Sequence, residues 1–150
     1  MRNLAILGST GSIGSSTLDV VKSNPGMFDI QLLAAKSNHP LLLEQIKLFK
    51  PNFIYLEDES SFISIKDAIK DIDQSLEVIN NEQDLLSLIS SNIIDTVVAA
   101  VVGIAGLNGV EAALSSGKRV LLANKESYVV AGEYLNKICK ENGGLIIPLD

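Results

Sequence analysis

Three glycines near the start of the chain are spaced so that they could bring main-chain amides against a phosphate group. Gly8, Gly11 and Gly14 directly follow the apolar run 4–7, and residues 12–23 have a pattern that can form a helix. A buried strand that breaks into glycines and then a helix points backbone N–H groups and the positive end of the helix dipole at an anion. A tight turn that binds nothing is the alternative.

The end of the next expected strand indicates which phosphate compound would bind. Domains that prefer NAD usually carry an acid about 20 residues after the glycines, where it binds the ribose 2′-hydroxyl. Here Lys36, Ser37 and Asn38 stand in that place and offer a cation, a hydroxyl and an amide, as a 2′-phosphate requires. The sequence therefore favours NADP(H) over NAD(H), with a merely solvated Lys36 as the alternative.

A second polar cluster, Asn124, Lys125 and Glu126, follows the apolar stretch 119–123. At the carboxyl end of a parallel strand, these side chains would face the same crevice as the glycine turn. Lys125 could hold an anionic substrate, while Asn124 and Glu126 could contact a nucleotide. The same residues could instead cap and begin a helix. The glycines within 102–107 could admit the nicotinamide half of a dinucleotide, or could only allow close packing.

These groups need a scaffold of alternating strands and helices, and the chain has the pattern of one. Apolar stretches predict strands at 3–7, 29–35, 53–56, 77–79, 96–101, 119–123 and 144–149. Helices are expected at 12–23, 40–49, 59–71, 82–91, 105–116 and 127–142. This order predicts an α/β fold: a Rossmann-like, doubly wound, mostly parallel sheet with helices on both faces, forming one domain over 1–150 with 96–101 as a central strand.

Composition excludes several classes of partner. The hydrophobic content of 47% is enough for a core, and the net charge of −6 argues against a nucleic-acid-binding surface. The longest uncharged apolar run, 97–107, is too short to cross a bilayer, so no membrane partner is expected. The one cysteine, Cys139, rules out an internal disulfide and fits a reducing compartment, for which we predict the cytoplasm.

Other reactive side chains are given structural roles. His39 is the only histidine and is expected in a surface loop, because its neighbours offer no catalytic partner. Cys139 is expected in the core, on a helix with Tyr134, Leu135 and Ile138. Three acids are expected to face solvent: Asp19, Asp71 and Asp73.

The segments together resemble the 1-deoxy-D-xylulose 5-phosphate reductoisomerase family, the NADPH-dependent enzymes of non-mevalonate isoprenoid synthesis. The resemblance covers the whole chain and rests on residues 8–14, 16–21, 24–25 with Phe28, 102–103, 105–107 and 121–127. One departure is at Lys36 and Ser37, where the family usually has glycine and then a variable residue. Asn38 matches the family pattern.

The resemblance implies roles for most of the candidate residues. NADPH would be bound by Thr10, Gly11, Ser12, Ile13, Asn38, Asn124 and Glu126, whereas Lys36 and Ser37 are assigned to it from their residue types alone. Lys125 would bind the sugar-phosphate substrate. Asp150 would be the first carboxylate ligand of a divalent metal, Mn²⁺ or Mg²⁺, in an Asp-Ser-Glu motif.

The implied activity is isomerisation and reduction of 1-deoxy-D-xylulose 5-phosphate to 2-C-methyl-D-erythritol 4-phosphate, with the metal as Lewis acid. No catalytic residue is expected within residues 1–150, which are expected to bind NADPH without turnover because one carboxylate holds a hard ion poorly. The full-length family member is expected to be a homodimer. The alternatives are another NADP-dependent dehydrogenase, such as a semialdehyde or homoserine dehydrogenase, and a non-catalytic dinucleotide-sensing module.

Overall fold

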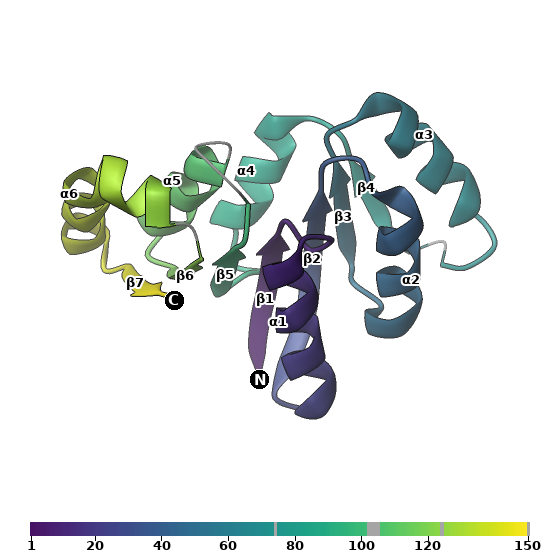
Figure 1. Cartoon of the computed structure of the whole chain (residues 1–150), viewed down its shortest axis with the longest axis horizontal. Coiled ribbons are helices and arrows are strands. Elements are labelled where there is room, and N and C mark those ends of the chain that lie inside the picture. Colours follow the sequence, from purple (N-terminus) through teal and green to yellow (C-terminus); the bar gives the residue numbers. More distant parts are fainter. Residues whose placement is uncertain (74, 102–105, 124, 150) are drawn as a thin grey trace.

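Strands and helices alternate from one end of the chain to the other (Figure 1). The computed structural model describes residues 1–73, 75–101, 106–123 and 125–149. The strands within these ranges are β1 Arg2–Leu7, β2 Phe28–Ala35, β3 Phe53–Leu56, β4 Glu77–Ile79, β5 Thr96–Ala99, β6 Arg119–Leu122 and β7 Leu145–Pro148. The helices are α1 Ser12–Ser23, α2 His39–Phe49, α3 Glu59–Ala68, α4 Glu82–Ser90, α5 Leu107–Ser115 and α6 Lys125–Asn142.

The strands form one parallel, seven-stranded sheet in the order β4-β3-β2-β1-β5-β6-β7. The direction of winding reverses between β1 and β5, and ligands of such sheets bind outside the carboxyl ends of the strands at that point. The predicted doubly wound parallel sheet is confirmed. We expected 96–101 to be central; β5 is an interior strand, while β1 occupies the middle of the order.

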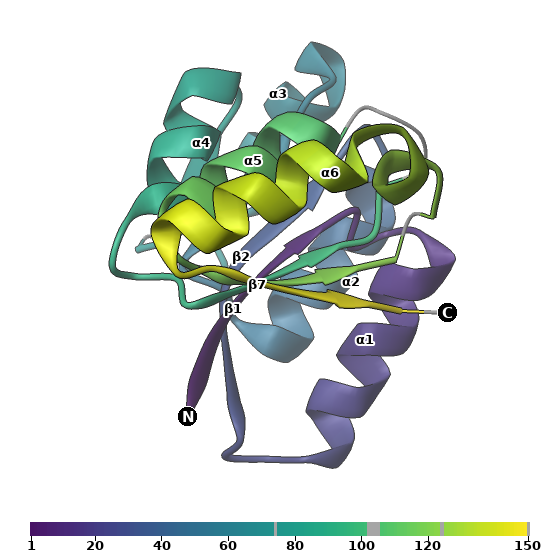
Figure 2. The same cartoon turned by 90° about the vertical axis from the view of Figure 1, so that its left-hand side faces the viewer.

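The core consists of two apolar layers, one on each face of the sheet. In β1, Ala5 and Leu7 pack toward α4, α5 and α6, whereas Leu4 and Ile6 pack toward α1, α2 and α3. Figure 2 shows α5 and α6 on one face of the sheet and α1 on the other. Because both faces are covered, the strands are near-continuous apolar runs. Such runs could be recognised in the sequence.

A β-bulge interrupts β2 at Gln31. Leu4 of β1 pairs with Ile30, and the next residue, Ala5, pairs with Leu32, so Gln31 has no partner on β1. The extra residue places Ile30 in one apolar layer and Leu32 in the other. The buried Gln31 side chain donates from Nε2 to Asp29 Oδ2 (2.9 Å) and accepts at Oε1 from Asn52 Nδ2 (2.7 Å).

Several helix boundaries differ from prediction, most clearly those of α3 and α6. Helix α3 was expected to run to 71 but ends at Ala68. Beyond it, the amides of Ile72 and Asp73 both donate to the carbonyl of Ile69 (3.0 and 3.2 Å), so the chain continues as a turn. Helix α6 was expected to begin at 127 but begins at Lys125. No helix in the described ranges is both long and apolar enough to cross a bilayer.

Candidate nucleotide-binding site

The glycine loop begins at the point where the sheet reverses its winding. The amides of Gly8 and Ser9 both donate to the carbonyl of Ala34, at the end of β2 (2.8 and 3.0 Å). Gly8 has a φ of +85°, and a Cβ built on it would lie 2.8 Å from the carbonyl oxygen of Ala100, beyond β5. This glycine is therefore required by the turn itself, since both its φ and its surroundings exclude a side chain.

Gly14 is required by packing of α1 on the loop. A Cβ on Gly14 would collide with the carbonyl oxygen of Gly8 and lie 2.6 Å from Ser9 Cα. Helix α1 therefore lies directly on the main chain of the turn. Two of the three glycines are thus explained by contacts within the protein.

Gly11 has no such explanation. It is exposed, with ordinary extended dihedral angles (φ −78°, ψ 174°), and a Cβ on it would approach nothing closer than the Gly8 carbonyl oxygen at 3.5 Å. That separation is a normal van der Waals contact. A glycine that the fold does not need, on the outer side of the loop, is what close approach of a ligand to the main chain would require.

The N-terminus of α1 has no side-chain cap, which is also true of α5, whereas α2, α3 and α4 are capped. Asn38 caps α2, Asp58 caps α3 and Asn81 caps α4, each accepting from a first-turn amide (3.3, 2.9 and 2.9 Å). Gly11 is the N-cap residue of α1 and provides no side-chain cap, and the first turn of the helix contains no acid. The positive end of its dipole is therefore available to an external anion.

The segment Lys36–Asn38 leaves the sheet next to this loop, because Leu7 at the end of β1 pairs with Ala34 of β2. The Lys36 carbonyl accepts from the Asp58 amide (2.9 Å), and the Ser37 carbonyl accepts from the His39 amide (2.8 Å) and from Ser61 Oγ (2.9 Å). The backbone is thus held while all three side chains stay exposed. The oxygen of the Asn38 amide caps α2, which leaves its NH₂ group as a donor.

An acid lies beside this segment. Asp58 accepts hydrogen bonds from Ser60 Oγ (2.7 Å) and from the Ser61 amide (2.9 Å), and it shares the single hydroxyl proton of Ser61 (2.8 Å) with the Ser37 carbonyl. These bonds favour the charged form, so they hold the pKa of the carboxyl below its ordinary value. Asp58 therefore carries its charge at neutral pH and organises the start of α3.

The second predicted cluster is only partly described. Asn124 and Asp150 lie outside the described residues, as do 102–105. The backbone of Lys125 and Glu126 forms the first turn of α6, directly after β6. The amide of Ala123 donates to the carbonyl of Ala99, so this turn begins at the same sheet edge as the glycine loop (3.0 Å). The roles assigned to these residues stay predictions.

The residues given structural roles are mostly where they were expected, with three corrections, at His39, Tyr134 and Asp73. His39 does not lie in a loop: it is the first residue of α2 and is half-buried, because the Asn38 cap and Pro40 start the helix one residue earlier than predicted. Tyr134 is 51% exposed, and its hydroxyl bonds Glu111 Oε1 (2.8 Å) instead of joining the core.

Cys139 packs against the core, and burial raises the pKa of its thiol, which disfavours the reactive thiolate. Leu135 and Ile138 are buried as predicted. Asp19 and Asp71 are exposed, as expected, and Asp73 is half-buried.

One contact to the glycine loop was missed. Gln45 of α2 is 5% exposed and donates from Nε2 to the carbonyl oxygen of Ser9 at 2.9 Å. Its position between Leu42 and Ile46, on the buried face of α2, was the available signal, because a polar side chain on an apolar helix face needs a buried partner.

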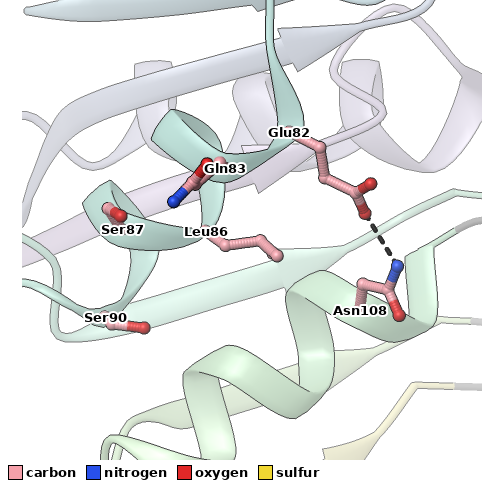
Figure 3. A pocket seen from close by; sticks show the side chains of 6 residues that line it. All are labelled: Glu82, Gln83, Leu86, Ser87, Ser90 and Asn108. Carbon is pink, nitrogen blue, oxygen red and sulfur yellow. Dashed lines mark hydrogen bonds between the residues drawn. The ribbon is translucent and has the colours of Figure 1, made fainter.

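A groove on the described surface lies elsewhere. It runs between α4 and α5 and is lined by Glu82, Gln83, Leu86, Ser87, Ser90 and Asn108 (Figure 3). Asn108 Nδ2 donates to Glu82 Oε1 across it (2.7 Å). None of these residues was a predicted ligand. Among the described residues, no three His, Cys, Asp or Glu side chains gather in a way that could hold a metal ion.

Comparison with known proteins gives a consistent result. The family model for 1-deoxy-D-xylulose 5-phosphate reductoisomerase matches residues 4–132. A protein of that name from Saccharophagus degradans is 43% identical over 150 residues, which are 100% of this chain and 38% of the relative. The chain thus spans well under half the length of this curated relative.

Solved structures agree. The enzyme from Zymomonas mobilis, in complex with NADPH, superposes with a TM-score of 0.90 at 34% identity, covering 99% of this chain and 39% of that one. A DOX-P reductoisomerase with NADPH, fosmidomycin and magnesium gives a TM-score of 0.91 at 38% identity, covering 99% of this chain and 36% of that one.

Proposed function

Because the chain belongs to the 1-deoxy-D-xylulose 5-phosphate reductoisomerase family, we propose that it forms the NADPH-binding domain of such an enzyme. The diphosphate of NADPH would lie against the main chain of Thr10, Gly11, Ser12 and Ile13. Gly11 is the observation that carries this proposal, because the protein's own packing leaves room for a side chain there and yet none is present. The uncapped start of α1 supports it, since the amides of a first helical turn bind anions.

The remaining nucleotide contacts follow from the same proposal. Lys36, Ser37 and the free NH₂ group of Asn38 would bind the 2′-phosphate, supported by their exposure on a segment whose backbone is held from both sides. Asn124 and Glu126 would contact the nucleotide, and Lys125 the sugar-phosphate substrate. Asp150 would be a ligand of Mn²⁺ or Mg²⁺.

The whole enzyme would convert 1-deoxy-D-xylulose 5-phosphate to 2-C-methyl-D-erythritol 4-phosphate. Bound NADPH would supply the hydride that reduces an aldehyde. The role of this chain would be to bind and orient the nucleotide. The cofactor would then be held in position for hydride transfer and would not have to meet the substrate by a random encounter. The described residues do not form a metal-binding group, and we assign them no metal-dependent step. Binding of NADPH without turnover stays a prediction from the sequence. We further propose a homodimeric, cytoplasmic enzyme.

Titration of the chain with NADPH and with NADH, followed by cofactor fluorescence, tests the proposal. We expect NADPH to bind and NADH to bind more weakly. Failure of NADPH to bind would remove the assignment of a cofactor domain. Equal affinity for the two cofactors would remove the 2′-phosphate contacts alone. Formation of 2-C-methyl-D-erythritol 4-phosphate by the chain would contradict the expectation of no turnover.

A further inference from the structure

Gln45 connects helix α2 to the glycine loop through a buried hydrogen bond. We propose that Gln45 is a positioning residue for the cofactor diphosphate: it holds the Ser9 carbonyl and thereby fixes the amides of the loop that follows. This inference rests on the proposed function and names a residue of the same site. Gln45 itself would not contact the ligand.

The contacts of Ser9 explain how this bond can position the loop. The Ser9 amide donates to Ala34 of β2 (3.0 Å), and its carbonyl accepts from Gln45 of α2 (2.9 Å). Its Cα lies 2.6 Å from the position that a Cβ on Gly14 of α1 would take. The main chain of Ser9 is therefore held by three elements, and Thr10 and Gly11 leave from this fixed point.

A glutamine at position 45 stabilises the core less than an apolar residue would. Its Oε1 is buried and has no hydrogen-bond partner among the described residues, and the same is true of Ser9 Oγ. A buried polar atom without a partner is costly, and an apolar side chain between Leu42 and Ile46 would avoid that cost. The bond from Nε2 to the loop is the interaction that a glutamine provides here and an apolar residue does not.

Helix α2 also joins the two halves of the proposed cofactor site. Asn38, proposed at the 2′-phosphate, caps its first turn, and Gln45 lies seven residues further on. Seven residues of α-helix span about 10 Å. One rigid element thus sets both the segment at 36–38 and the loop at 8–13, so it sets their separation.

The test compares Gln45→Met with Gln31→Met. The first keeps the side-chain length and removes the donor to Ser9. The second removes another buried glutamine with its own bonds to Asp29 and Asn52, in the part of β2 away from the loop. Binding of NADPH and of adenosine 2′-monophosphate, which lacks the diphosphate, is measured for both variants, along with their stability in urea.

We expect Gln45→Met to weaken NADPH about ten-fold, as loss of one bond to a charged group would. Adenosine 2′-monophosphate should bind it as it binds the unsubstituted chain. Gln31→Met should lose stability without a change in either affinity. If Gln45→Met does not fold, Gln45→Leu serves, because its smaller apolar side chain suits a site between Leu42 and Ile46 and cannot donate.

Unchanged NADPH affinity in a folded Gln45 variant would overturn the inference and leave the proposed function standing. Equal weakening of both ligands would also overturn it, because the effect would then not concern the diphosphate. If the unsubstituted chain binds no NADPH, the proposed function itself fails, and this inference fails with it.

Discussion

Replacement of Gly11 by alanine should separate cofactor binding from folding. The φ of −78° and ψ of 174° at this position suit any residue, and the nearest atom to an added Cβ is the Gly8 carbonyl oxygen at 3.5 Å. The folded state therefore loses nothing. The unfolded state becomes less flexible, which typically adds about 0.4–1 kcal/mol to the free energy of unfolding. We expect Gly11→Ala to be as stable as the unsubstituted chain, or slightly more so.

The effect on binding should be large by comparison. The new methyl group would lie on the exposed side of the loop, where a phosphate must approach to reach the amides of Ser12 and Ile13. Displacement of that phosphate by a methyl group would remove at least one hydrogen bond to a charged group, worth about 1.5–3 kcal/mol. The dissociation constant of NADPH should therefore rise by about 10- to 150-fold.

Fluorescence titration with NADPH and thermal unfolding of the same preparation measure the two effects together. Adenosine 2′-monophosphate provides an internal control, because it reports the 36–38 segment without the diphosphate. An unchanged NADPH affinity would refute the argument that a phosphate approaches Gly11. A clear loss of stability would refute it in another way, by showing that the glycine serves packing.

The other predictions concern the loop, the 2′-phosphate segment and the start of α3. Gly14→Ala should lower the free energy of unfolding by about 1–3 kcal/mol in urea, because its Cβ would overlap the loop backbone; normal stability would mean that α1 can shift freely. Lys36→Ala should weaken NADPH about ten-fold and NADH little, with exposed Lys22→Ala as the matched control; a parallel loss for both cofactors would contradict a 2′-phosphate contact. Since hydrogen bonds lower the pKa of Asp58 in the folded state, its contribution is present above the ordinary aspartate pKa and is lost as pH falls through the folded value. Asp58→Asn should therefore be less stable than the unsubstituted chain at neutral pH and approach it in acid; a gap that does not change with pH would exclude this linkage.

Much of the scaffold could be predicted because its signals are local. Each strand is a short apolar run between polar or glycine-rich segments, so strand positions are correct to within one or two residues. The role of Gly8 in a turn could be predicted from its place between an expected strand and an expected helix. The distinction between Gly8 and Gly14, which the fold needs, and Gly11, which it does not, depends on atoms of residues distant in sequence and became visible only in three dimensions.

The errors have the same origin. Tyr134 has helical spacing with Leu135 and Ile138, but Glu111 of the neighbouring helix offers its hydroxyl a partner at the surface. The bond from Gln45 to Ser9 joins residues 36 positions apart. A local sequence pattern cannot identify a hydrogen-bond partner that far along the chain. The polar residue on the buried face of α2 did indicate that a partner exists.

The bulge at Gln31 fixes both the length of β2 and the face of the sheet on which each of its side chains lies. Before the bulge, even-numbered residues face one apolar layer, and after it they face the other. Each half of the strand can therefore bury its own apolar side chains. Deleting one residue would restore plain alternation, turn one half of the strand inside out and draw Lys36–Asn38 back by about 3.3 Å. The stretch of chain between the glycine loop and the segment 36–38, proposed to bind the 2′-phosphate, is therefore expected to tolerate substitutions far better than insertions or deletions.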